Sequence, residues 1–98
     1  MTNPIPHDIH MIDPHGEILM LMGTGQYLEA AHRYAVVAAD TTLSVETRAI
    51  AQACCATAYW KGGCETLARQ IAERIDREAL GERRWKMMRE IREYAHRA

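Results

Sequence analysis

The chain has 98 residues, enough for one small domain. Its net charge of −1 lacks the basic excess of a nucleic-acid-binding domain, which argues against nucleic acid as a partner. Its apolar runs, such as Ile18 to Met22, are far shorter than the roughly 20 residues of a membrane-spanning helix, so no membrane partner is expected.

The first thirteen residues are expected to form an extended N-terminal arm, followed by a single helical domain over residues 14–98. All three prolines lie in residues 1–14, and proline removes a backbone donor and favours an extended conformation before it. Pro14 can also occupy the first turn of a helix with Asp13 as its N-cap. The first helix is therefore predicted from Pro14 to Met22, where a Gly-Thr-Gly tripeptide ends it.

Four further helices are predicted from apolar residues that recur at spacings of three and four. They span about residues 26–39, 45–61, 64–79 and 82–96. Ser44 is the expected N-cap of the helix over 45–61. Gly81 is expected to separate the last two helices, although they could run on through it at a cost of about 1 kcal/mol. No segment alternates polar and apolar residues as a strand does, so the fold is expected to be all-α.

The same spacing predicts which side chains of these helices face the core. In chain order, the predicted inward residues of the second and fourth helices are Tyr27, Ala30, Ala31, Tyr34, Val37, Ala38, Leu67, Ala68, Ile71, Ala72 and Ile75. The fifth helix carries Trp85, Met88 and Ile91 among many charged residues.

One pattern occurs twice. Gly25 is followed five residues later by Ala30, and Gly63 is followed five residues later by Ala68, each inside an amphipathic helical run. The two copies lie 38 residues apart, and internal repeats with periods of roughly 20–50 residues indicate stacked supersecondary units.

These residues resemble the tetratricopeptide repeat (TPR) family, in which two antiparallel helices cross at small residues and are joined by a turn with glycine. The matching positions are Gly25, Ala30 and Tyr34 in the first copy and Ala56, Tyr59, Gly63 and Ala68 in the second. The resemblance covers residues 14–80 and departs from the family pattern at Ile18, Thr42 and Leu80. It implies two helix hairpins followed by a C-terminal capping helix.

Within that family, the segment Leu21 to Gln26, with its Gly-Thr-Gly turn, resembles the small TPR-like chaperone that holds needle subunits of type III secretion systems. The chain departs from that chaperone at its C-terminal end, which is shorter and rich in charge.

The TPR resemblance implies that the first helix of each hairpin lines a concave, apolar groove. The residues expected to bind a partner there are Leu19, Met22, Ile50, Ala53, Thr57, Trp60 and Lys61. Such a groove suits a partner's amphipathic helix, and Trp60 is the favoured single contact because tryptophan is enriched at binding hot spots. The alternative is that Trp60 packs in the core.

The helix over 82–96 is rich in basic residues and supplies the main alternative function. Arg83, Arg84, Lys86 and Arg89 could contact nucleic acid in a small regulator, although Glu82, Glu90 and Glu93 are interleaved with them. The default interpretation is a solvated capping helix, since terminal repeats need a polar outer face.

Metal and thiol chemistry are weaker alternatives. His7, His10 and His15 lie among acidic residues and could bind a divalent metal, but their spacing matches no closed site, and no cofactor is expected. Cys54, Cys55 and Cys64 are odd in number, which argues against a disulfide scaffold. The start of the chain also lacks the features of a signal peptide. We therefore expect a cytoplasmic protein with small apolar cysteines, of which Cys64, close to a helix N-terminus, is the candidate reactive thiol.

The sequence therefore predicts a non-enzymatic protein-binding module, that is, an adaptor, chaperone or inhibitor, which captures a helix or extended segment of another protein. A homodimer is also compatible with the sequence, because two repeats leave apolar ends that normally stack on a neighbour.

Overall fold

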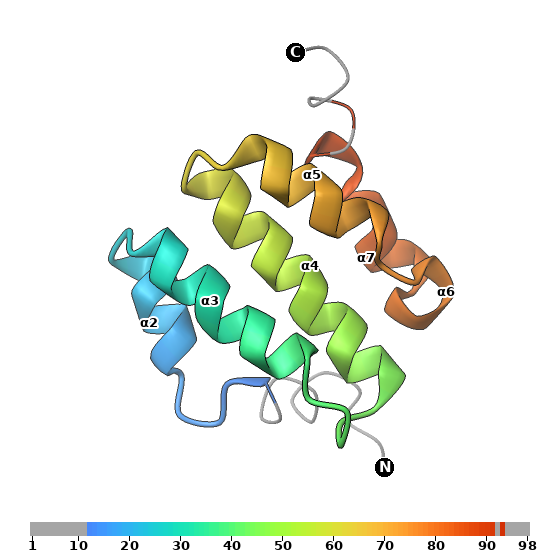
Figure 1. Ribbon diagram of the computed structural model, residues 1–98, viewed down its shortest axis with the longest axis horizontal. Coiled ribbons are helices and arrows are strands. Elements are labelled where there is room, and N and C mark those ends of the chain that lie inside the picture. Colours follow the sequence, from blue (N-terminus) through green and yellow to red (C-terminus); the bar gives the residue numbers. More distant parts are fainter. Residues whose placement is uncertain (1–11, 92, 94–98) are drawn as a thin grey trace.

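The protein is all-α over the residues described by the computed structural model, 12–91 and 93, and no strand occurs in that part of the chain. The helices are α2 (Glu17–Gly23), α3 (Tyr27–Ala38), α4 (Val45–Lys61), α5 (Glu65–Glu73), α6 (Arg77–Leu80) and α7 (Glu82–Met87). Figure 1 shows α4 crossing the centre of the molecule, with α3 along one side and α5 along the other. α2 packs on α3, and α6 packs on both α4 and α7.

The N-terminal end of α2 is held by an acidic side chain. Asp13 Oδ1 accepts a hydrogen bond from the backbone N–H of Ile18 at 3.1 Å, and its Oδ2 accepts one from Leu19 at 3.0 Å. The predicted start at Pro14 with Asp13 as its N-cap is wrong, because Gly16 is the N-cap of α2, although the Asp13 carboxylate does bond to N–H groups of the first turn. The chain turns at residues 14–16, with Gly16 at φ +69°, before the helix begins at Glu17.

Residues 1–11 of the predicted N-terminal arm lie outside the described part of the chain. Residue 12 is described, and Ile12 is buried in the core. The end of the predicted arm is therefore packed against the helical domain, where burial of an Ile side chain stabilises the fold by about 1.5–3 kcal/mol.

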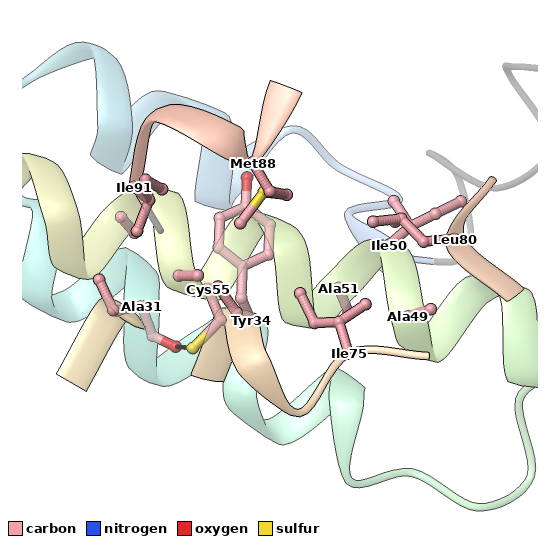
Figure 2. Close-up of a cluster of buried hydrophobic side chains, with 14 of the residues drawn as sticks. Ala31, Tyr34, Ala49, Ile50, Ala51, Cys55, Ile75, Leu80, Met88 and Ile91 are labelled. Atoms are coloured by element: carbon pink, nitrogen blue, oxygen red, sulfur yellow. Dashed lines mark hydrogen bonds between the residues drawn. The ribbon is translucent and has the colours of Figure 1, made fainter. Parts of the chain in front are cut away.

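Helix α4 has the predicted bounds and is the centre of the core. The Ser44 hydroxyl accepts a hydrogen bond from the Thr47 N–H at 3.1 Å, which confirms the predicted cap. Four alanines of α4 are almost fully buried, and they let the neighbouring helices approach closely: Ala49, Ala51, Ala56 and Ala58. Ala30 and Ala31 of α3 are also fully buried, and Cys55 Sγ donates to the Ala31 carbonyl at 3.3 Å (Figure 2).

The predicted helix over 64–79 is divided in two. α5 ends at Glu73, and the Asp76 side chain then accepts hydrogen bonds from the N–H groups of Glu78 and Ala79, which starts α6. An aspartate that caps a new helix therefore overrides the continuous apolar spacing. Gly81, at φ +94°, separates α6 from α7, so the alternative of one helix running through it is wrong.

Most predicted inward residues are buried or half-buried. Leu67 is an exception, since it lies on the exposed side of α5. Leu80 is fully buried and packs with Ile50 and Ile75 in the central cluster (Figure 2). Met88 and Ile91 are buried. The predicted single helix over 82–96 is wrong at its middle, because α7 ends at Met87 and the chain turns at Met88. Its predicted end, at residue 96, lies outside the described residues.

Candidate functional site

An apolar groove of about 360 Å³ lies over α4 and is bounded by α2, α3 and α7. We call it the α4 groove. It is lined by Met22, Tyr34, Ile50, Ala53, Cys54, Thr57, Arg84, Met87 and Met88. In Figure 2 the Tyr34 ring, which comes from α3, points toward Met88, which follows α7. The groove therefore joins helices that are far apart in the sequence.

The floor of the groove is one stripe of α4. Ile50, Ala53, Cys54 and Thr57 recur at spacings of three, one and three, so they lie on the same face of the helix. Ile50 is buried, whereas the other three are half-buried. The small side chains of Ala53, Cys54 and Thr57 leave the middle of the stripe hollow.

Methionines form much of the walls. Met22 comes from the last turn of α2, and Met87 and Met88 come from the end of α7. Met87 is 74% exposed, whereas Met88 is buried. Methionine side chains are unbranched and adapt to partners of different shape, so the walls can adjust to an apolar ligand.

Among the described residues that line the α4 groove, Arg84 is the one whose side chain is charged at neutral pH. Burial raises the pKa of the Cys54 thiol to about 11, with the nearby Arg84 charge acting in the opposite direction. Burial also raises the pKa of Tyr34 to about 12, with smaller contributions from Cys54 and Asp13. Both groups are therefore neutral near pH 7, whereas a guanidinium stays protonated.

Four residues of the predicted partner-binding set line this groove, and three do not. Met22, Ile50 and Thr57 are brought together, with Ala53 between the last two. Leu19 is 68% exposed on α2, and Lys61 is exposed at the end of α4. Trp60 is half-buried and packs against the core, one helical turn beyond Thr57, so it lies outside the groove lining.

The basic residues proposed for nucleic acid do not share one surface. Arg84 lines the α4 groove, whereas Lys86 and Arg89 line a separate hollow with Glu82 and Glu93. Arg89 Nε donates to Glu93 at 2.7 Å, so carboxylates interrupt the positive charge there. Arg83 is exposed.

That hollow is organised by Arg77. Its guanidinium lies 5.3 Å from the centre of the Trp85 ring and forms an ion pair with Glu82. Hydrogen bonding to Arg77 lowers the pKa of Glu82. Both ion-pair partners are exposed, so this pair contributes little to stability.

The remaining candidate residues are not assembled into a site. His7 and His10 lie outside the described residues, and His15 is exposed. No group of three potential metal ligands occurs among residues 12–91 and 93. Cys64, at the N-cap of α5, is half-buried and free, and burial raises the pKa of the Cys55 thiol to about 11.

Sequence reasoning missed the contributions of α3 and α7 to the groove. Tyr34, Arg84 and Met87 were not expected there because their positions depend on how α7 packs across α4. One signal could have found the α7 contribution: Met88 lies 38 residues after Ile50, the same interval that separates Gly25 and Gly63.

Comparisons of the chain with family models, with curated proteins and with solved structures find no match. Within the described residues, no helix has the length and apolar character needed to cross a membrane.

Proposed function

We propose that the protein is a non-enzymatic binding module, an adaptor, chaperone or inhibitor, which captures a segment of a partner protein in the α4 groove. The observation that carries this proposal is the apolar groove itself, with a floor of small residues and walls of methionine. Apolar grooves between helices suit amphipathic or extended segments of other proteins, and Met87 offers an exposed apolar side chain at the edge.

We also propose that the helices are stacked as TPR-like repeat units of 38 residues. The turns at Gly25 and Gly63 have the same backbone geometry, and Ala30 and Ala68 after them are both fully buried. A third interval supports this: Ile12, Ile50 and Met88 follow one another at 38 residues, and all three are buried.

In this arrangement α2, α4 and α7 are the first helices of successive units. First helices line the concave face of such solenoids, which form extended binding surfaces by their curvature. Most residues that line the α4 groove come from these three helices or directly follow α7, and Tyr34 comes from α3. The position of the groove therefore agrees with the proposed stacking. The proposed binding centre thereby moves from Trp60 to Met22, Ile50, Thr57 and the α7 methionines.

Site-specific photocrosslinking tests the binding proposal. A photoreactive residue is placed at Met87, which is 74% exposed and lines the groove, and in a matched variant at Val36, which is 73% exposed on α3 away from it. In cells that naturally make the protein, we expect a protein crosslink from position 87 and not from position 36.

A blocked groove supplies the control. Ala53→Arg in the Met87 variant places a long side chain on the half-buried floor of the groove and should remove the crosslink while circular dichroism keeps its helical signal. Equal crosslinking from positions 36 and 87, or a crosslink that survives Ala53→Arg in a folded chain, would contradict the proposal.

A further inference from the structure

The charge in the α4 groove points to the chemistry of its occupant. Arg84 is half-buried. Within the described part of the chain it forms one hydrogen bond, and this bond is long, 3.5 Å from Nη1 to the Leu80 carbonyl oxygen. No carboxylate forms an ion pair with Arg84 within residues 12–91 and 93. The other described side chains that line the groove carry no charge at neutral pH.

Three other arginines have carboxylate partners, whereas Arg48, Arg69, Arg74 and Arg83 resemble Arg84 in forming no ion pair among the described residues. What distinguishes Arg84 is that it is half-buried at the α4 groove. Arg77 pairs with Glu82, Arg89 with Glu93, and Arg33 with Glu29. Arg84, which faces the α4 groove, has no carboxylate in an ion pair with it among the described residues. A guanidinium that is partly removed from water gains most from a carboxylate, which it can bind through two parallel hydrogen bonds.

We propose that the occupant of the α4 groove is an acidic, apolar segment of a partner protein, in which an Asp or Glu pairs with Arg84 while neighbouring apolar side chains contact Met22, Ile50 and Met87. This inference rests on the proposed function, because it specifies the ligand of the same groove. The apolar contacts supply the burial, and Arg84 supplies the selection for a carboxylate, since charge complementarity gives specificity more than affinity.

Peptide selection tests this without knowledge of the natural partner. A phage-displayed library of random peptides is selected against the full chain, against Arg84→Glu, and against Arg83→Glu. The last is the matched control, because it makes the same charge change at the adjacent, exposed residue. Peptides that also bind a folded Ala53→Arg or Thr57→Arg chain are discarded, since these two variants block the groove floor.

We expect the peptides that bind the unaltered chain to contain Asp or Glu beside apolar residues. Replacing that acid with its amide in a selected peptide should weaken binding by about tenfold to the unaltered chain and to Arg83→Glu. The same replacement should have no effect on binding to Arg84→Glu, which should instead select peptides with Lys or Arg. If Arg84→Glu does not fold, Arg84→Gln should show the same loss of acid preference.

The outcomes separate this inference from the proposed function. Groove-dependent peptides without an acidic residue, with affinities unchanged by Arg84→Glu, would overturn the inference and leave the binding proposal intact. No enrichment, or peptides that bind equally to the groove-blocked chains, would overturn both. Self-association of the chain that Ala53→Arg abolishes would identify a second copy as the occupant and would also overturn the inference.

Discussion

The α2–α3 turn and the α4–α5 turn have the same backbone geometry but different surroundings. In the α2–α3 turn, the N–H of Gly25 bonds to the Met22 carbonyl at 3.2 Å, and the N–H of Gln26 bonds to Leu21 at 2.8 Å. In the α4–α5 turn, the equivalent bonds join Gly63 to Trp60 at 3.2 Å and Cys64 to Tyr59 at 2.8 Å. Both are Schellman motifs with a glycine at positive φ, +79° and +88°.

The residue before each of these glycines shows the difference. In the first turn it is Thr24, whose hydroxyl lies 3.0 Å from the Met20 carbonyl oxygen and accepts a hydrogen bond from Gln26. In the second turn it is Gly62, where an added Cβ would lie 3.0 Å from Leu28 Cδ2 of α3. The backbone geometry is therefore repeated, while contact with the preceding helix pair selects the side chain.

The largest effects are expected at the helix crossings that follow the two turns. Ala30 and Ala68 have no exposed surface, so Ala30→Leu and Ala68→Leu should each lower the free energy of unfolding by about 1–3 kcal/mol through overpacking. Chemical denaturation measures the loss. Ala35→Leu, on the exposed side of α3, is the control and should have little effect. If Ala30→Leu and Ala68→Leu were as stable as Ala35→Leu, the helices would not be closely packed at these two crossings.

The next largest losses of stability are expected at the turn glycines, and the losses at positions 25 and 63 should be equal. Gly25→Ala and Gly63→Ala each place a Cβ at positive φ with no neighbouring atom within 4 Å, so backbone strain alone should cost about 1–2 kcal/mol in both. Gly23→Ala is the control in the same turn. It has open space and lies in α2, so it should be neutral or stabilise by up to about 1 kcal/mol. Unequal losses at positions 25 and 63 would break the equivalence of the two turns.

The fold was predictable where one local signal decides the structure. The Ser44 cap begins α4, and Gly62-Gly63 ends it. Both signals involve only residues that are close to one another in the sequence. The start of α2 was mispredicted because Asp13 bonds to backbone N–H groups beyond the turn at residues 14–16. The division between α5 and α6 was mispredicted because the apolar spacing continues through the cap that Asp76 forms with Glu78 and Ala79. Apolar spacing does not report such bonds.

The candidate site was predictable on α4 and at Met22 of α2, but not on α3 or α7. The stripe of α4 from Ile50 to Thr57 follows from helical spacing, and it is the floor of the groove. Arg84 and Met87 were not predicted there, because a side chain on α7 reaches α4 only through the Gly81 turn, whose direction depends on φ +94° and tertiary packing. Trp60 was assigned to the groove from the TPR resemblance and favoured there for its residue type, whereas its position on α4 is one turn beyond the groove lining.

A smaller effect should distinguish the second turn. Gly62→Ala brings a methyl group against Leu28, whose side chain is 47% exposed and can move, so the loss should be no more than about 1 kcal/mol. Leu28→Ala should recover most of that loss in the double variant, because it removes the nearest atom. Denaturation of the two single variants and the double variant gives the coupling. Additive losses would show that the contact with Leu28 does not select glycine.

The smallest effect should belong to the first turn. Thr24→Val keeps the shape of the side chain and removes a hydroxyl that lies 3.0 and 3.2 Å from the Met20 and Leu21 carbonyl oxygens. Because these bonds are exposed, the loss should be about 0.5 kcal/mol. Amide hydrogen exchange should show it as faster exchange at Gln26, whose N–H closes the turn. Thr66→Val, at an exposed position of α5, controls for the change of residue type. Unchanged exchange at Gln26 would mean that glycine geometry alone holds the first turn, as it does the second.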